Sequence, residues 1–139
     1  MDLHSIRKPR DVSGGPRIDR QLEGWIRSGI ERDERYTAED IFKGLALERF
    51  QLFRYPQGIV ITQITGHSRL LVFLLSGENF DSWKHEANED LKAFASGLGL
   101  GVIEAYCRPG LEKSLKSLGW VKTQVVLRLQ KEEETREAI

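Results

Sequence analysis

Hydrophobic residues recur every three or four positions in four parts of this chain, and that spacing predicts four helices. The first helix is expected at about 17–32. The second begins after Thr37, because Thr37 and Asp40 have the spacing of a capping box, in which each side chain accepts the other residue's backbone N–H. The apolar face of this second helix consists of Ile41, Phe42 and Leu45.

The third and fourth helices are marked by clear end signals. The third is long, at about 81–98, and leads into the glycine-rich sequence GLGLG. The fourth starts at Pro109, a residue favoured in a first helical turn, and ends at Gly119, a typical C-terminal cap. The apolar stripe of the long helix is expected to consist of Trp83, Ala87, Leu91, Phe94 and Leu98.

Runs rich in β-branched and aromatic residues predict five strands. Three lie between the second and third helices, at 50–55, 58–65 and 69–76, and the short turns YPQG and TGHS separate them. Such short connections predict an antiparallel meander. The third run is apolar nearly throughout, which is typical of a central strand covered on both faces. Two further strands are expected at 102–107 and 120–129.

The order of these elements predicts a mixed α/β (α+β) fold with one central sheet and helices on both faces. The step from strand 69–76 through the long helix to the next strand is a βαβ crossover, so those two strands should be parallel. The length of 139 residues suits one domain. We expect a flexible arm at 1–16, the domain at 17–130 and a charged tail at 131–139.

Composition excludes several classes of protein. Lysine plus arginine equals aspartate plus glutamate, 21 against 21, so no global field favours nucleic acid or a membrane surface. No apolar run approaches the ~20 residues of a transmembrane helix, and the N-terminus lacks the apolar middle of a signal peptide. We therefore expect an intracellular protein without a membrane partner. A single cysteine excludes an intramolecular disulfide.

The two ends of the chain carry opposite charges. Residues 1–20 hold five basic and three acidic side chains, a net charge of +2, and residues 131–139 hold two basic and four acidic ones, a net of −2. The charge pattern alone favours two solvated tails. The alternative is that the arm of one subunit docks on the tail of another. The residues expected at such an interface are Arg7, Lys8, Arg10, Glu132, Glu133 and Glu134.

Two stretches of the sequence resemble a known family. TAEDIFKGLALERFQLF followed by GIVITQIT, and the closing IEAYCRPGLEKSLKSLGW, are similar to small proteins of the GNAT fold (the N-acetyltransferase superfamily) encoded by tailed bacteriophages. The resemblance covers about residues 17–130 and implies a GNAT-like order α-α-β-β-β-α-β-α-β. The usual first strand of that fold is missing from the pattern, because the polar arm takes its place, and so is the usual final strand.

Active members of this superfamily bind the pyrophosphate of acetyl-CoA between the central strand and the long helix. An arginine or glutamine and spaced glycines there let backbone N–H groups approach the phosphates. Only Gly77 fits this pattern, because no arginine or glutamine precedes it and Phe80 is bulky. Glu78 and Asp81 are negatively charged, and a carboxylate costs on the order of 1 kcal/mol or more at ~4 Å from a phosphate. We expect Asp81 to be the helix N-cap. The degenerate loop consists of Ser76, Gly77, Glu78, Asn79, Phe80 and Asp81.

Few residues are candidates for chemistry. Tyr106 ends the strand after the long helix, where the superfamily often places a general acid that protonates the leaving thiolate; the alternative is a cover for the sheet edge. Cys107 is expected to be a small buried apolar residue. No metal site is expected, because no carboxylate or cysteine stands at metal-ligand spacing from the three histidines. These are His4, His67 and His85.

The resemblance and the degenerate loop favour a protein without catalysis and without a cofactor. The first hypothesis is a structural or interaction protein of a phage particle, a head–tail connector or internal virion component. It would assemble through its arms as a homo-oligomeric ring with portal or tail proteins, in the virion after assembly in the host cytoplasm. The alternative is a cytoplasmic acetyl-CoA-dependent N-acyltransferase with Tyr106 as its acid. The hypothesis of a DNA-contacting protein rests on the basic arm alone, so nucleic acid is the least supported partner.

Overall fold

The computed structural model describes residues 17–31, 35–66, 68–124, 127 and 129. The predicted arm and tail, including the six predicted interface residues, lie outside these ranges. The described part of the chain contains four helices and four strands, in the predicted order as far as the fourth helix. Their bounds are α1 Arg20–Gly29, α2 Ala38–Ala46, β1 Phe50–Tyr55, β2 Gly58–Thr65, β3 Arg69–Gly77, α3 Phe80–Gly97, β4 Val102–Ala105 and α4 Pro109–Lys116.

The four strands form one mixed sheet in the order β1-β2-β3-β4. β1 and β3 both pair antiparallel with β2, and β4 pairs parallel with β3, so the predicted meander and βαβ crossover are confirmed. The register of β2 and β3 shifts between two neighbouring residues of β2: Ile61 faces Leu74, whereas Thr62 faces Val72. Phe73 is therefore an extra residue on β3, a bulge that bends the strand in the middle of the sheet.

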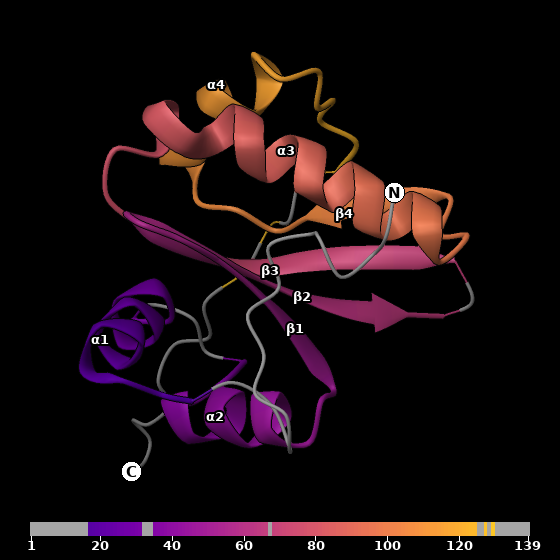
Figure 1. Cartoon of the computed structure of the whole chain (residues 1–139). Helices are drawn as coiled ribbons and strands as arrows, with labels where there is room; N and C mark the ends of the chain where they lie inside the picture. The colour runs from indigo at the N-terminus through magenta and orange to yellow at the C-terminus, as the bar shows by residue number, and fades with distance from the viewer. Residues whose placement is uncertain (1–16, 32–34, 67, 125–126, 128, 130–139) are drawn as a thin grey trace, which may run out of the picture.

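Helices cover both faces of the sheet, with α1 and α2 on one side and α3 and α4 on the other (Figure 1). β3 is buried on both faces, as predicted for a central strand. Each buried aliphatic or aromatic side chain contributes roughly 1.5–3 kcal/mol relative to exposure. Members of the two clusters include Leu22, Ile26, Ile41, Leu45, Ile59 and Ile61 under α1 and α2, and Phe53, Val60, Val72, Trp83, Leu91 and Phe94 under α3.

The first two helices begin at side-chain caps. The predicted capping box is confirmed, because the Thr37 hydroxyl accepts the Asp40 N–H at 3.1 Å and the Asp40 carboxylate accepts the Thr37 N–H at 3.0 Å. α1 has a cap that was not predicted, Asp19, which accepts the Leu22 N–H at 2.8 Å. Arg54 of β1 binds the same carboxylate at 2.8 Å, so this cap also fixes α1 on the sheet.

The apolar stripe of α3 is confirmed except at its end. Leu98 is 44% exposed, because α3 ends at Gly97 and Leu98 is the C-cap residue, outside the helical stripe. β4 ends at Ala105, two residues earlier than predicted. No helix within the described ranges has the length and apolar character needed to cross a membrane. The buried stripe residues are Trp83, Ala87, Leu91 and Phe94.

The predicted strand at 120–129 is wrong for the residues that the structure describes. Residues 120–124 have no regular structure, and Val121 is 78% exposed. Leu127 and Leu129 also belong to no strand, and the remaining positions lie outside the described residues. A strand is stable only when it pairs with a neighbour and buries one face. Within the described residues this segment has neither.

Candidate functional site

The junction between β3 and α3, where the sequence predicts a degenerate cofactor loop, is bonded to the turn between β1 and β2. The N–H of Glu78 donates to the carbonyl of Gln57 at 2.8 Å. Gly77 has a φ of 138°, and a Cβ on it would lie 2.2 Å from the Gln57 oxygen and 2.4 Å from Cα of Gly58. Only glycine permits this backbone approach. The glycine that fits the phosphate pattern therefore has a structural reason of its own.

α3 begins differently from the prediction. Asn79 holds the N-cap position in the left-handed conformation, with φ 52° and ψ 47°, and its side chain makes no capping bond. Asp81 is therefore not the N-cap; it lies in the first helical turn. Ser82 binds the helix start to the turn, since its hydroxyl lies 2.9 Å from Oε1 of Gln57 and 2.7 Å from the Asn79 carbonyl.

The carboxylate of Asp81 faces α4 instead of the helix axis. It accepts the Ser114 hydroxyl at 2.8 Å and pairs with the Lys84 ammonium at 3.0 Å. The hydrogen bond from Ser114, followed by Lys84, lowers the pKa of Asp81 below its ordinary value. The group is therefore charged at neutral pH, and a negative charge is favourable in the first turn of a helix. A phosphate at this helix start would meet that fixed charge.

A hollow of about 360 Å³, open to solvent, lies between the β1–β2 turn, the start of α3, and α4. The ring of Phe80 forms part of its wall and packs edge-on against Trp83, with ring centres 4.9 Å apart. Among the described residues the lining has amides, hydroxyls and one carboxylate but no lysine or arginine. It suits a neutral or cationic group better than a phosphate. The lining residues are Gln57, Asn79, Phe80, Asp81, Ser82 and Ser114.

Tyr106, the predicted general acid, lies beside the middle of β3. Its N–H donates to the Val72 carbonyl at 3.1 Å, four residues before Ser76, which is roughly 13 Å along a strand. Tyr106 is 53% exposed, and the guanidinium of Arg35 lies 5.0 Å from the centre of its ring. The structure therefore places Tyr106 with the loop between α1 and α2 and not against the junction. Its position is that of a cover on the sheet edge.

Cys107 is exposed, so the prediction of a buried residue was wrong. The physical reason is the early end of β4 at Ala105, which leaves Cys107 outside the space between the sheet and α3. Partial desolvation and then the charge of Glu112 raise the pKa of the thiol above its ordinary value. Such a thiol is protonated at neutral pH and is a weak nucleophile.

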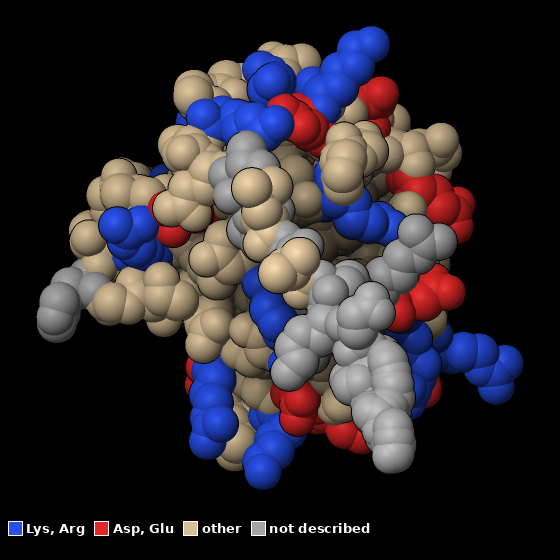
Figure 2. Space-filling view, turned by 180° about the vertical axis from the view of Figure 1, so that it is seen from behind, with Lys and Arg blue, Asp and Glu red and all other residues tan. Residues whose placement is uncertain are grey.

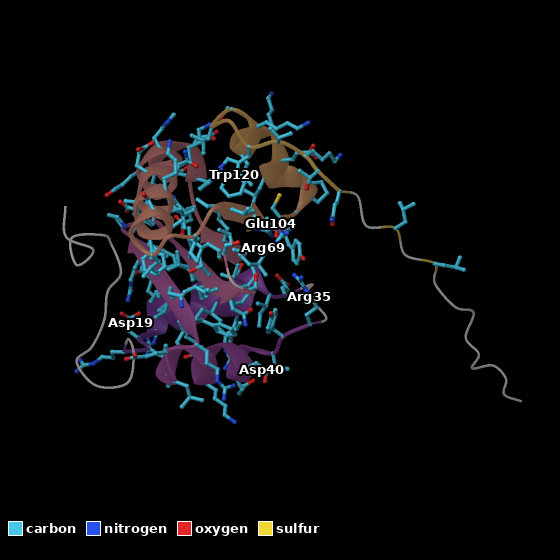
Figure 3. All side chains as sticks on the ribbon, turned by 90° about the vertical axis from the view of Figure 1, so that its right-hand side faces the viewer. Asp19, Arg35, Asp40, Arg69, Glu104 and Trp120 are labelled. Carbon is cyan, nitrogen blue, oxygen red and sulfur yellow. The ribbon has the colours of Figure 1, made fainter. Side chains whose placement is uncertain are left out.

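Sequence reasoning missed a surface along the outer edge of the sheet. Arg69 and Glu104, on neighbouring parallel strands, form an ion pair at 2.7 Å. Figure 3 shows both, and Arg35 from the loop between α1 and α2, on the same side of the molecule. We call this the β4 edge surface: Arg35, Arg69, Val102, Glu104 and Tyr106. No local pattern predicts it, because its residues come from the α1–α2 loop, β3, β4 and the residue after β4, and only the folded chain brings them together.

The described residues offer neither a metal site nor a continuous basic face. No group of three or more His, Cys, Asp and Glu side chains in the described ranges is placed to hold a metal ion. Lysine and arginine side chains are interspersed with acidic ones over the face shown in Figure 2. Nucleic-acid binding favours a clustered basic footprint, which this face does not have among its described residues.

No family model, curated protein or solved structure matches the chain. The GNAT-like family therefore stays a prediction from the sequence. The arrangement of side chains described above carries the functional proposal.

Proposed function

We propose that the protein is a non-catalytic interaction protein, a GNAT-like domain that serves as a structural component of a phage particle. The observation that carries the proposal is the bonding at the β3–α3 junction. A phosphate-binding loop presents unbonded N–H groups at a helix start, whereas here Glu78 gives its N–H to Gln57 and Asp81 places a carboxylate in the first turn. These groups stabilise the junction itself and oppose an anionic ligand.

Exposed apolar side chains support the interaction part of the proposal. Val102 and Tyr106 at the β4 edge are 39% and 53% exposed, and the three described apolar residues after Trp120 are exposed by 78% or more. Val102 and Tyr106 both lie at the β4 edge, and exposed apolar side chains grouped on one surface are typical of a protein contact. The resemblance supplies the remainder: a ring at the head–tail connector or among the internal virion proteins, with portal or tail proteins as partners.

The test combines ligand binding with particle mass. A ligand at ~100 times its Kd raises the free energy of unfolding by roughly 2.7 kcal/mol, several degrees for a domain of this size. We expect no change in melting temperature with millimolar acetyl-CoA, and a mass by light scattering above the 15.9 kDa of one chain. A clear upward shift together with a monodisperse monomer would overturn the proposal.

One observation favours the alternative, an acetyl-CoA-dependent N-acyltransferase. The ladder between β3 and β4 ends at Val72, and the described residues place no strand beside Phe73–Gly77 on that side. Two parallel strands that separate in this way leave backbone groups accessible to a ligand, and Tyr106 lies where they part. If acetyl-CoA binds, acetylation of a panel of amines should be compared with Tyr106→Phe, which keeps the ring under Arg35 and removes the hydroxyl.

A further inference from the structure

We infer that residues 107–120, which comprise α4 and the loops on either side of it, open and close over α3 as one unit. We call this unit the α4 lid. The inference goes beyond the proposed function, because it concerns a conformational change within one chain and requires no partner. The two states differ in whether the indole of Trp120 is packed on the core or exposed.

Backbone hydrogen bonds attach the chain to the sheet only as far as Tyr106. The N–H of Tyr106 donates to the Val72 carbonyl at 3.1 Å. Within the described residues, the backbone bonds of the α4 lid all join the lid to itself, as from Trp120 to Leu115 at 3.2 Å. Residues 121–124, on its other side, make no backbone bond to the described part of the sheet. The link between Tyr106 and Cys107 is therefore the place where the lid can hinge.

The α4 lid buries little apolar surface. Leu115 is the one buried residue of α4, and it belongs to neither of the two core clusters. Trp120 is half-buried and packs against the cluster under α3. α3, by contrast, buries five side chains. A segment with few buried apolar contacts opens locally at a lower free energy than the core of the same protein.

Polar contacts supply the rest of the attachment, and all of them lie on the first half of α3, beside which Figure 1 places α4. Among the described residues they are three side-chain hydrogen bonds, two of them exposed and one partly buried. Water can replace such partners when the lid opens, so no polar group is left buried and unpaired. The bonds run from Ser114 to Asp81 at 2.8 Å, from Lys84 to Ser117 at 2.9 Å and from Trp120 to Asn88 at 2.8 Å.

Opening of the α4 lid would change two surfaces. Ser114 lines the hollow beside the turn between β1 and β2, so the hollow would lose part of its wall. Trp120 would leave the core cluster, and its indole and the side chain of Leu115 would become exposed. Exposed apolar side chains of this kind are typical of protein contacts. The lid is therefore a device that hides or presents an apolar surface.

Native-state hydrogen exchange of the full chain tests the inference, and two indole N–H groups serve as matched probes. Both are bonded at 2.8 Å, Trp120 to Asn88 and Trp83 to the carbonyl of Glu78. We expect the indole of Trp120 to exchange together with the amides of α4, at a free energy of opening below that of the β2 amides. The indole of Trp83 belongs to the core cluster and should exchange more slowly.

Two substitutions remove one link each without weakening a helix. Ser114→Ala and Asn88→Ala both introduce the better helix former, so faster exchange cannot come from lower helix propensity. We expect each to speed the exchange of the α4 amides roughly 2- to 10-fold, the effect of one hydrogen bond, and to leave the β2 amides unchanged. Ser96→Ala is the control, because Ser96 is an exposed serine of α3 that forms none of the three links.

Three results would overturn the inference. If the α4 amides exchange only together with those of β2, the lid is not a separate unit. If both variants leave the exchange of α4 unchanged, the links do not hold the lid. If they speed exchange equally in α4 and β2, the links stabilise the whole domain. None of these results bears on acetyl-CoA binding or on particle mass, so the proposed function is tested separately.

Discussion

The backbone of Gly77 allows a direct test of why a glycine stands at the β3–α3 junction. Its φ of 138° is a conformation that other residues rarely adopt, and a Cβ would lie 2.2 Å from the carbonyl oxygen of Gln57. The next contact, 2.4 Å from Cα of Gly58, is also with backbone, so no side-chain rotation relieves it. We expect Gly77→Ala to lower the free energy of unfolding.

The magnitude follows from two separate costs. A sparsely populated backbone conformation costs roughly 1–3 kcal/mol, and overpacking a rigid site costs roughly another 1–3 kcal/mol. Their sum is a loss of about 2–6 kcal/mol. In a domain of this size one kcal/mol changes the melting temperature by roughly 3–5 °C, so we expect a fall of roughly 6–30 °C. Thermal melts and urea unfolding of the variant measure it.

A glycine elsewhere in the chain supplies the matched control. Gly24 lies in α1 and is exposed, and outside its own helix no atom lies within 4 Å of the place that a Cβ would take. Gly24→Ala should therefore raise the free energy of unfolding by about 0.5–1 kcal/mol, because alanine is the better helix former. An unchanged melting temperature for Gly77→Ala would refute the reasoning. The glycine would then not be required by packing, and a role in approaching phosphates would become the better explanation.

Two further predictions concern titratable groups. The folded pKa of Asp81 lies below its unfolded value of about 3.9, so its contribution to stability is complete above that pH and is lost as the pH falls through the folded value. Urea unfolding should show Asp81→Asn less stable than the original chain at pH 6 and the difference shrinking below about pH 4; a pH-independent difference would contradict the Ser114 and Lys84 contacts. Cys107 should react fully with a thiol reagent in the native state, at a rate that keeps rising above the ordinary thiol pKa, and Glu112→Gln should move that curve to lower pH. A native protein that does not react would show that the thiol is buried.

The features that sequence predicts well here are local ones. The capping box of Thr37 and Asp40 lies within one helical turn, and the turns that join β1, β2 and β3 are only a few residues long. The stripe from Trp83 to Phe94 is fixed by helical periodicity, so its burial against a sheet could be predicted before the sheet was known. The parallel crossover to β4 was predictable from chain order, because a strand, a helix and a second strand of the same sheet form a βαβ unit.

The features that sequence does not predict depend on contacts between distant segments. Asp81 has the chemistry of an N-cap, but Ser114 on α4 draws its carboxylate away, and Asn79 starts the helix earlier in a left-handed conformation. Whether Cys107 is buried or exposed depends on where β4 ends, and hydrogen bonding to β3 sets that end. The alternating pattern at 120–129 indicates that the segment can form a strand, but it forms one only where a neighbouring strand offers backbone groups to pair with.

The same physical reasoning explains why a binding role fits the β4 edge better than the junction. At the junction, a phosphate could use the Glu78 N–H only if the 2.8 Å bond to Gln57 broke, a loss of about 0.5–1.5 kcal/mol, while the charge of Asp81 opposed the ligand. The turn between β1 and β2 would also have to move, because it is packed on Gly77. At the edge, Val102 and Tyr106 donate their N–H groups to the β3 side, so the N–H groups of Ile103 and Ala105 point the other way, and a partner chain can reach them without breaking a bond of the sheet. Binding a cofactor at the junction would therefore require the protein to rearrange, whereas binding a partner chain at the β4 edge would not.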